Sequence, residues 1–386
     1  MSYTGGLMTY VQDHIVHDAD SHVMELSDWI IEYADPDIRD RIRPLDLGRA
    51  GKFAAEAVAD AEARRGDEEA ARRLEDQLLT AKGWMALGAF DPAERSRALD
   101  LLGFSSQLVF STFAALQFAG DDQELTMGGS RALNRALADF CCDDDRLVAV
   151  GQALWIGPDD TLSLVTEALE EGCGAILFPS DPGRHGISPT HADYDPVWAL
   201  LEERDIPFML HIGGGGRPVR RPFHDNGRPV TDFLGGGENV RSKDYMALNQ
   251  LPEQFLSAMV LDGVFQDHPG LRGGCIEQGA MWVPSWLRRL DSVIRTFSRT
   301  EPALAGLEMK PSDYVHRQLW FTPFAGEDVG WLIDQCGDDL FLFSSDYPHP
   351  EGGRDPVARF EETMGDVGDT ARTRFYETNY AEMLAL

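Results

Sequence analysis

Short apolar runs alternate with amphipathic segments along most of this chain. Segments such as 161–171 and 196–204 carry apolar residues three and four positions apart, which is typical of helices with one buried face. The apolar runs are shorter and rich in β-branched and aromatic residues, which predicts strands buried on both faces. Eight such runs can be marked, at residues 15–20, 106–111, 147–155, 174–180, 207–212, 271–277, 318–323 and 340–346.

This alternation predicts repeated βα units and a parallel sheet, and eight units suit a closed (β/α)8 TIM barrel. Barrels of this size usually form one domain, so we expect residues 1–386 to fold as a single domain. Two stretches, about 23–105 and 213–250, are too long to be simple connections. They follow the first and fifth predicted strands, so we expect them to lie as lids over the catalytic mouth of the barrel.

Ionisable residues fall where the apolar runs end. HDADSH ends the first run, LHIGG the fifth, CIEQG the sixth and SSDYPHP the eighth. The carboxyl ends of barrel strands share one mouth, and alternate positions on a strand face the same side. Several carboxylates gathered there would repel one another without a bound cation. We therefore predict a metal centre built from Asp18, Asp20, His22, His211, Glu277 and Asp346.

Four segments carry a family resemblance. HDADSHV, LHIG, HPGLRGGCIEQGAMWVPSWLRRLD and FSSDYPHPEG resemble the amidohydrolase-2 branch of the amidohydrolase superfamily, which includes the aminocarboxymuconate-semialdehyde and resorcylate decarboxylases. The resemblance implies metal-binding positions for Asp20, His22, His211 and Asp346. Asp20 stands where that branch usually has the first His of an HxH motif, and Glu277 stands where its decarboxylases have a His. Both departures replace nitrogen with oxygen.

Ligand composition suggests which metal and which reaction. Two imidazoles with several carboxylates favour iron or manganese over structural zinc. The set matches the di-iron carboxylate proteins and resembles a small group of amidohydrolase-fold proteins that hydroxylate C–H bonds with O2. Our leading hypothesis is therefore a monooxygenase with two iron ions, or iron with manganese, that uses O2 and an electron donor. A zinc hydrolase or single-metal decarboxylase is the alternative, and an inactive barrel that scaffolds a partner is a non-enzymatic one.

Other residues are candidates for catalysis or for substrate binding. Besides Glu277 and Asp346 as catalytic groups, His349 could bind a second metal or the substrate, or simply pack in the DYPHP turn. Between positions 213 and 243 there are six basic residues and three acidic ones, which could clamp a carboxylate or a coenzyme A thioester, or pair internally. The predicted substrate-binding residues are Arg217, Arg220, Arg221, Trp282 and Tyr347.

The overall charge narrows the range of partners. A net charge of −31 repels phosphate backbones and anionic lipids, so we expect a small-molecule substrate and neither nucleic acid nor membrane as a partner. The five cysteines show no CxxC spacing and are expected to be reduced. The beginning of the chain lacks the pattern of a signal peptide. We expect a soluble, cytoplasmic homo-oligomer.

Overall fold

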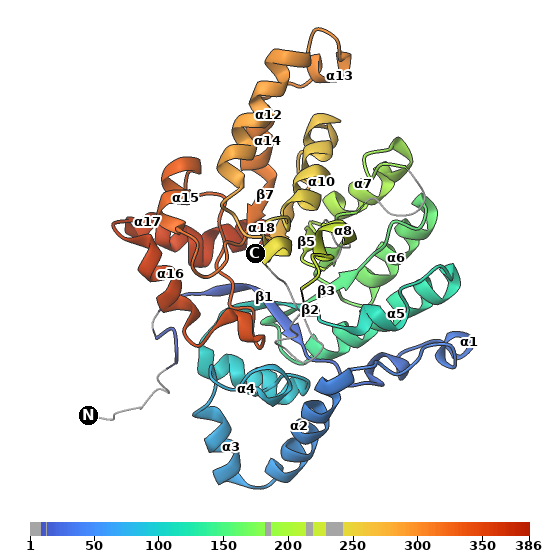
Figure 1. The fold of residues 1–386 in the computed structure, drawn as a ribbon, viewed down its shortest axis with the longest axis vertical. Coiled ribbons are helices and arrows are strands. Elements are labelled where there is room, and N and C mark those ends of the chain that lie inside the picture. Colours follow the sequence, from blue (N-terminus) through green and yellow to red (C-terminus); the bar gives the residue numbers. More distant parts are fainter. Residues whose placement is uncertain (1–8, 13, 182–186, 214–218, 229–241) are drawn as a thin grey trace.

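The computed structural model describes residues 9–12, 14–181, 187–213, 219–228 and 242–386. Seven parallel strands form one curved sheet, in which each strand pairs with the next along the chain (Figure 1). The predicted α/β class with a parallel sheet is confirmed. The strands are β1 His17–Val23, β2 Ser106–Ser111, β3 Leu147–Gln152, β4 Ala175–Leu177, β5 Phe208–His211, β6 Gly273–Ile276 and β7 Leu319–Phe321.

Helices follow the strands and surround the sheet (Figure 1). The β1–β2 connection holds α1 Pro36–Arg39, α2 Gly51–Arg64, α3 Glu68–Glu75 and α4 Pro92–Leu102. The next connections hold α5 Gln123–Cys141, α6 Pro158–Glu170, α7 Asp195–Glu203, α8 Arg221–His224, α9 Ser242–Tyr245, α10 Gln250–Leu261 and α11 Val264–Asp267. The remaining helices are α12 Val283–Phe297, α13 Pro302–Ala305, α14 Pro311–Gln318, α15 Val329–Cys336, α16 Pro356–Met364, α17 Asp369–Thr373 and α18 Asn379–Leu384.

The eighth predicted strand does not form a regular strand. Residues 340–346, all of which are described, instead lie between β7 and β1 and make backbone hydrogen bonds to both. The Leu342 amide donates to the Phe321 carbonyl over 2.9 Å, and the Ala19 amide donates to the Phe343 carbonyl over 3.0 Å. The segment therefore joins the two edges of the seven-stranded sheet without matching the predicted eighth strand.

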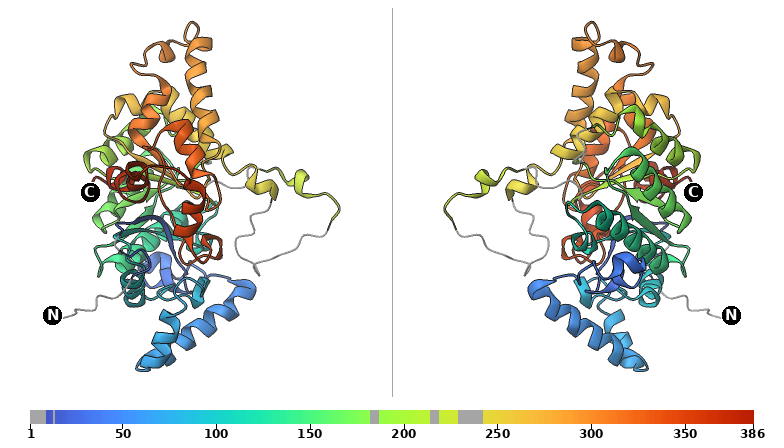
Figure 2. Two further views of the ribbon diagram at one scale, coloured as in Figure 1. Left: turned by 90° about the vertical axis from the view of Figure 1, so that its left-hand side faces the viewer. Right: turned by 90° about the vertical axis from the view of Figure 1, so that its right-hand side faces the viewer.

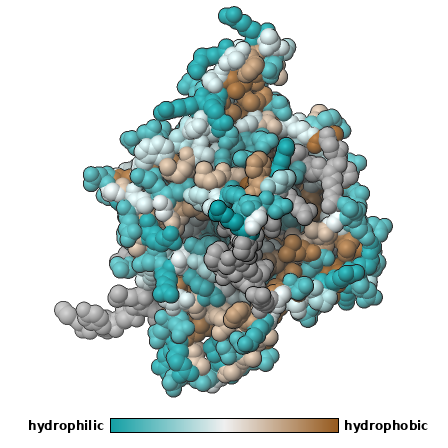
Figure 3. Space-filling view, viewed as in Figure 1, coloured by the Kyte–Doolittle hydropathy of each residue, from teal (hydrophilic) through white to brown (hydrophobic). Residues whose placement is uncertain are grey.

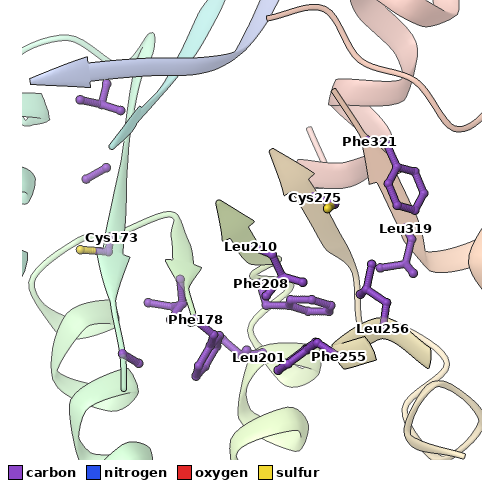
Figure 4. Close-up of a cluster of buried hydrophobic side chains, with 14 of the residues drawn as sticks. Cys173, Phe178, Leu201, Phe208, Leu210, Phe255, Leu256, Cys275, Leu319 and Phe321 are labelled. Atoms are coloured by element: carbon purple, nitrogen blue, oxygen red, sulfur yellow. The ribbon is translucent and has the colours of Figure 1, made fainter. Parts of the chain in front are cut away.

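Two of the three buried apolar clusters among the described residues form layers on the two faces of the sheet. The inner cluster takes at least one apolar residue from each of the seven strands, such as Met209 from β5. The outer cluster packs between sheet and helices and includes Phe208 and Leu210, the neighbours of Met209 (Figure 4). This alternation places the next residue, His211, on the inner face at the carboxyl end of β5.

Long connections follow β1 and β5, and their role as lids stays a prediction. The first connection contains α2 and α3, and the Asp67 side chain caps α3. The Gly83 amide donates to the Pro348 carbonyl over 2.9 Å, so this connection contacts the turn after Asp346. In the second, α8 and α9 stand away from the body of the protein (Figure 2).

Polar residues cover much of the visible surface (Figure 3), and the helices are correspondingly short or polar. The face in Figure 3 is largely hydrophilic. Within the described part of the chain, every helix is too short or too polar to cross a lipid bilayer. Among the cysteines Cys142 is exposed and the others are buried, and all five are free thiols.

Candidate metal centre

Four of the six predicted ligands converge at the carboxyl ends of β1, β5 and β6. Asp20, His22, His211 and Glu277 each offer one ligand atom, and these atoms lie within 4.8 Å of one another. His211 Nε2 lies 3.3 Å from Asp20 Oδ1 and 3.6 Å from Glu277 Oε2. His22 Nε2 lies 3.2 Å from the same Asp20 oxygen. We call these four residues the ligand group.

Asp346 and His349 adjoin the ligand group through His22. These three residues also offer atoms within 4.8 Å of one another. His349 Nδ1 lies 3.0 Å from Asp346 Oδ1, and the His349 ring stacks on the His22 ring with centroids 4.2 Å apart. A fifth predicted ligand, Asp346, is therefore next to the ligand group.

The donor atoms of this site suit a divalent cation. Within the described residues, Asp20 Oδ2, His22 Nδ1 and Asp346 Oδ2 are buried and make no hydrogen bond. Burying such groups unpaired is costly, whereas imidazole nitrogen and carboxylate oxygen are the usual ligands of manganese, iron and zinc. The residues present therefore fit a metal ion.

Burial and mutual charge set the protonation of these groups. Burial and, to a smaller extent, the nearby His349 lower the pKa of His22 to about 3, so His22 is neutral and able to act as a ligand. Burial alone would raise the pKa of Asp20, but His211 and His22 outweigh it and hold that pKa well below its usual range. Burial raises the pKa of Asp346 to about 6.

Asp18 belongs to neither group. The pairing of β1 with β2 shifts register between Asp18 and Ser21, so the strict alternation expected from the sequence breaks there. The Asp18 carboxylate accepts hydrogen bonds from Gln107 Nε2 at 2.7 Å and from the Ser345 amide and hydroxyl at 2.7 and 2.6 Å. The role of Asp18 as a ligand thus gains no support from the geometry.

The predicted substrate-binding residues are dispersed. The Trp282 indole donates to the Gly279 carbonyl over 2.9 Å, and the buried Tyr347 hydroxyl donates to the Leu87 carbonyl over 2.6 Å. The indole nitrogen of Trp282 and the hydroxyl of Tyr347 thus donate their hydrogens to backbone carbonyls of the protein itself. Arg220 is exposed, the Arg221 side chain is not described, and Arg217 lies outside the described residues.

The family model for amidohydrolases matches residues 18–386, nearly the whole chain. This protein belongs to the amidohydrolase family. The resemblance noted in the sequence is confirmed.

Several amidohydrolase-family relatives are decarboxylases. Gamma-resorcylate decarboxylase of Rhodococcus jostii (strain RHA1) is 25% identical over 52% of this chain, and the match spans 57% of that enzyme's length. The enzyme of the same name from Rhizobium sp. (strain MTP-10005) is 23% identical over 66% of this chain and 76% of its own length.

Solved structures share the amidohydrolase fold over their full length. An amidohydrolase from Mycobacterium avium subsp. paratuberculosis K-10 has a TM-score of 0.71 and 22% identity, with 96% of this chain and 99% of that chain covered. The 5-carboxyvanillate decarboxylase of Novosphingobium aromaticivorans DSM 12444, complexed with manganese, has a TM-score of 0.64 and 20% identity, with both chains covered completely. At these identities the likeness shows the fold.

The monooxygenase hypothesis is wrong. The matching relatives are decarboxylases, which are lyases and not oxidoreductases. The hypothesis rested on the ratio of carboxylates to imidazoles, but such a ligand set suits manganese as well as iron and does not specify a reaction. The findings favour the decarboxylase alternative. The expected pair of iron ions is not supported either, because the solved decarboxylase holds manganese.

Glu277 reaches the ligand group through an unusual backbone conformation. Ile276 lies in the inner cluster, so strict alternation would turn the next side chain outwards. Glu277 instead has φ +52°, in the left-handed region that residues other than glycine seldom adopt. Asp346 has the same φ of +52°. Strain at two acidic residues of one site is typical of functional positions.

No pattern in the sequence pointed to the residues that support the site from behind. The buried Glu25 carboxylate accepts hydrogen bonds from the Ser111 hydroxyl at 2.5 Å and from the Thr112 and Phe113 amides at 2.7 and 3.0 Å. It thereby fixes the loop that follows β2. The hydroxyl of Thr112 in turn lies 3.1 Å from His349 Nε2.

Arg95 ties the first long connection to the site. This residue of α4 has no exposed surface, and its guanidinium donates to the Gly88 carbonyl at 2.8 Å and to the His22 carbonyl at 2.5 Å. It also lies over the Tyr347 ring, 5.3 Å from the centroid. Arg95 therefore holds the backbone of a metal-ligand candidate from outside the sheet.

Proposed function

We propose that this protein is a decarboxylase that depends on a divalent cation and acts on a hydroxylated aromatic carboxylate. The observation that carries the proposal is the buried Asp346–His349 pair, 3.0 Å apart, beside a ligand group that fits a metal. The gamma-resorcylate and 5-carboxyvanillate decarboxylases among its relatives support the same reaction.

One divalent cation such as Mn2+, in place of the two irons expected from the sequence, would be held by Asp20, His22, His211 and Glu277. When bound, the metal supplies positive charge that binds and orients the oxygen atoms of the substrate. Replacing two histidines of the usual pattern with Asp20 and Glu277 makes the donor set richer in oxygen, which suits Mn2+.

The reaction needs one proton at a defined place. When the bond between the ring and the carboxylate breaks, CO2 leaves and the bonding electron pair stays on the ring carbon, which must then take up a proton. Burial raises the pKa of Asp346 to about 6, close enough to neutrality for a general acid. We assign Asp346 as the donor and His349 as the partner that holds its carboxyl in place. Decarboxylation of this kind needs neither O2 nor an electron donor.

The test is turnover of hydroxybenzoates by the protein stripped with EDTA and then reloaded with Mn2+. With 2,6-dihydroxybenzoate and 5-carboxyvanillate as the panel, CO2 release should require the metal and proceed at the same rate with and without O2. Asp346→Asn should lower kcat by at least about a hundredfold, because it removes the proton donor. Asp334→Asn, an exposed position on α15, should leave kcat unchanged.

No CO2 release from any member of the panel by the reloaded protein would contradict the proposal. So would turnover by Asp346→Asn at the wild-type rate, because the proton would then come from another group.

A further inference from the structure

We infer that Thr112 is a positioning residue that fixes the hydrogen of the His349 ring on Nε2, so that Nδ1 faces Asp346 with a lone pair. The hydrogen on Nε2 follows from the hydrogen bonds of this structure, and Nδ1 then carries a lone pair when His349 is neutral. Its catalytic consequence rests on the proposed decarboxylase function.

The Thr112 hydroxyl has three polar neighbours, of which the Met24 sulfur at 4.0 Å is a weak acceptor. Its Oγ1 lies 2.8 Å from the Val23 carbonyl oxygen and 3.1 Å from His349 Nε2. A carbonyl oxygen can only accept a hydrogen bond, so the hydroxyl donates its hydrogen to Val23. The hydroxyl oxygen must then accept from His349, and Nε2 therefore carries a hydrogen.

This hydrogen bond determines what the other ring nitrogen offers. A neutral imidazole carries one hydrogen, so Nδ1 has a lone pair when Nε2 is the donor. His349 Nδ1 faces Asp346 Oδ1 at 3.0 Å. It can thus accept a hydrogen bond from the Asp346 carboxyl, whereas the other tautomer would donate one to the carboxylate. Only the first arrangement holds a carboxyl group ready to give a proton to the ring carbon.

The Thr112 hydroxyl is held in place without help from His349. The Thr112 amide donates to the buried Glu25 carboxylate, and so does the Phe113 amide. The Glu25 carbonyl accepts from the Trp84 indole over 3.1 Å, which fixes the Glu25 backbone as well. On the other side, stacking on His22 at an interplanar angle of 16° limits rotation of the His349 ring. The positions of the Thr112 backbone and of the His349 ring are therefore both fixed by neighbouring residues, and these positions set the hydrogen bond between Thr112 and His349.

The experiment compares Thr112→Val with Thr112→Ser. Valine keeps the shape of threonine and removes the hydroxyl, whereas serine keeps the hydroxyl and removes the methyl group. The first readout is the tautomer of His349, measured from ¹⁵N chemical shifts of histidine-labelled protein loaded with Zn2+, which is diamagnetic. The His349→Gln variant assigns the signal. The second readout is kcat and KM for 2,6-dihydroxybenzoate with Mn2+.

We expect His349 to carry its hydrogen on Nε2 in the wild type and in Thr112→Ser, and to lose this preference in Thr112→Val. The valine variant should lower kcat at least about tenfold with KM within about twofold, and serine should restore kcat. A hydrogen on Nδ1 in the wild type, or an unchanged tautomer in Thr112→Val, would overturn the inference. So would equal kcat losses in both variants, because the methyl group would then be the cause. If no variant, nor the wild type, releases CO2, the decarboxylase function fails while the tautomer measurement still decides the role of Thr112.

Discussion

Glu277 combines a candidate metal ligand with a strained backbone at one residue. Its carboxylate lies 3.6 Å from His211 Nε2, and its φ is +52°. Two substitutions separate these properties. Alanine removes the carboxylate and keeps the strain, whereas glycine removes both.

We predict that Glu277→Ala and Glu277→Gly weaken Mn2+ binding equally, by at least about tenfold, because each loses the same ligand. In the metal-free state the glycine variant should be more stable than the alanine variant by about 1 kcal/mol. Isothermal titration with Mn2+ and urea unfolding measure the two effects. Wild-type affinity in either variant would remove Glu277 from the ligand group.

Asp346 should make the stability of the metal-free protein depend on pH. Burial raises its pKa from 3.8 to about 6, so the folded protein keeps a proton that the unfolded chain releases between these values. The contribution of Asp346 is therefore full below about pH 4 and is lost as the pH rises through 6. Over this range the wild type should lose about 3 kcal/mol more stability than Asp346→Asn.

The predicted difference in pH dependence is measured by urea unfolding of EDTA-treated wild type and Asp346→Asn at several pH values. Asp18, whose pKa burial raises to about 7, is present in both proteins and cancels from the comparison. Parallel curves for the wild type and Asp346→Asn would show that Asp346 is ionised throughout.

At the scale of elements, α4 and β1 are coupled through one buried side chain. Arg95 donates to the His22 carbonyl, next to a candidate ligand side chain. Arg95→Met keeps the apolar length of the side chain but leaves that carbonyl without its donor. We predict about tenfold weaker Mn2+ binding, because groups behind a ligand set its orientation.

Arg97→Met is the matched control on the same helix. Arg97 is partly exposed and pairs with Glu75 instead of β1, so this variant should bind Mn2+ like the wild type. Equal affinities for Arg95→Met and Arg97→Met would mean that α4 does not support the site.

Seven strands and the grouping of four candidate ligands could be predicted because both depend on local pattern. Apolar runs ending in acidic residues or histidine marked β1, β5 and β6, and their parallel arrangement brought Asp20, His22, His211 and Glu277 together. The sequence could not predict that Asp18 lies outside the ligand group, because the register shift in β1 depends on its pairing with β2. The proposed role of Thr112 could not be predicted either, because it depends on contacts with residues 89 and 237 positions away in the sequence.

At the scale of the whole molecule, the fold does not determine the reaction. The amidohydrolase fold is shared with relatives at 22% identity or less, and one fold can support different reactions. The ligand ratio that suggested oxygen chemistry is compatible with manganese and decarboxylation. What distinguishes decarboxylation is the need for a single proton at the carbon that loses the carboxylate.

The most direct test of this account is therefore decarboxylation in D2O. Protein loaded with Mn2+ should convert 2,6-dihydroxybenzoate to CO2 and 1,3-dihydroxybenzene that carries one deuterium, at the carbon that held the carboxylate. The deuterium is located by NMR at early turnover, against product incubated without protein. CO2 with singly deuterated product is the predicted result. Unchanged substrate, or a product that has kept its carboxylate, would contradict the account.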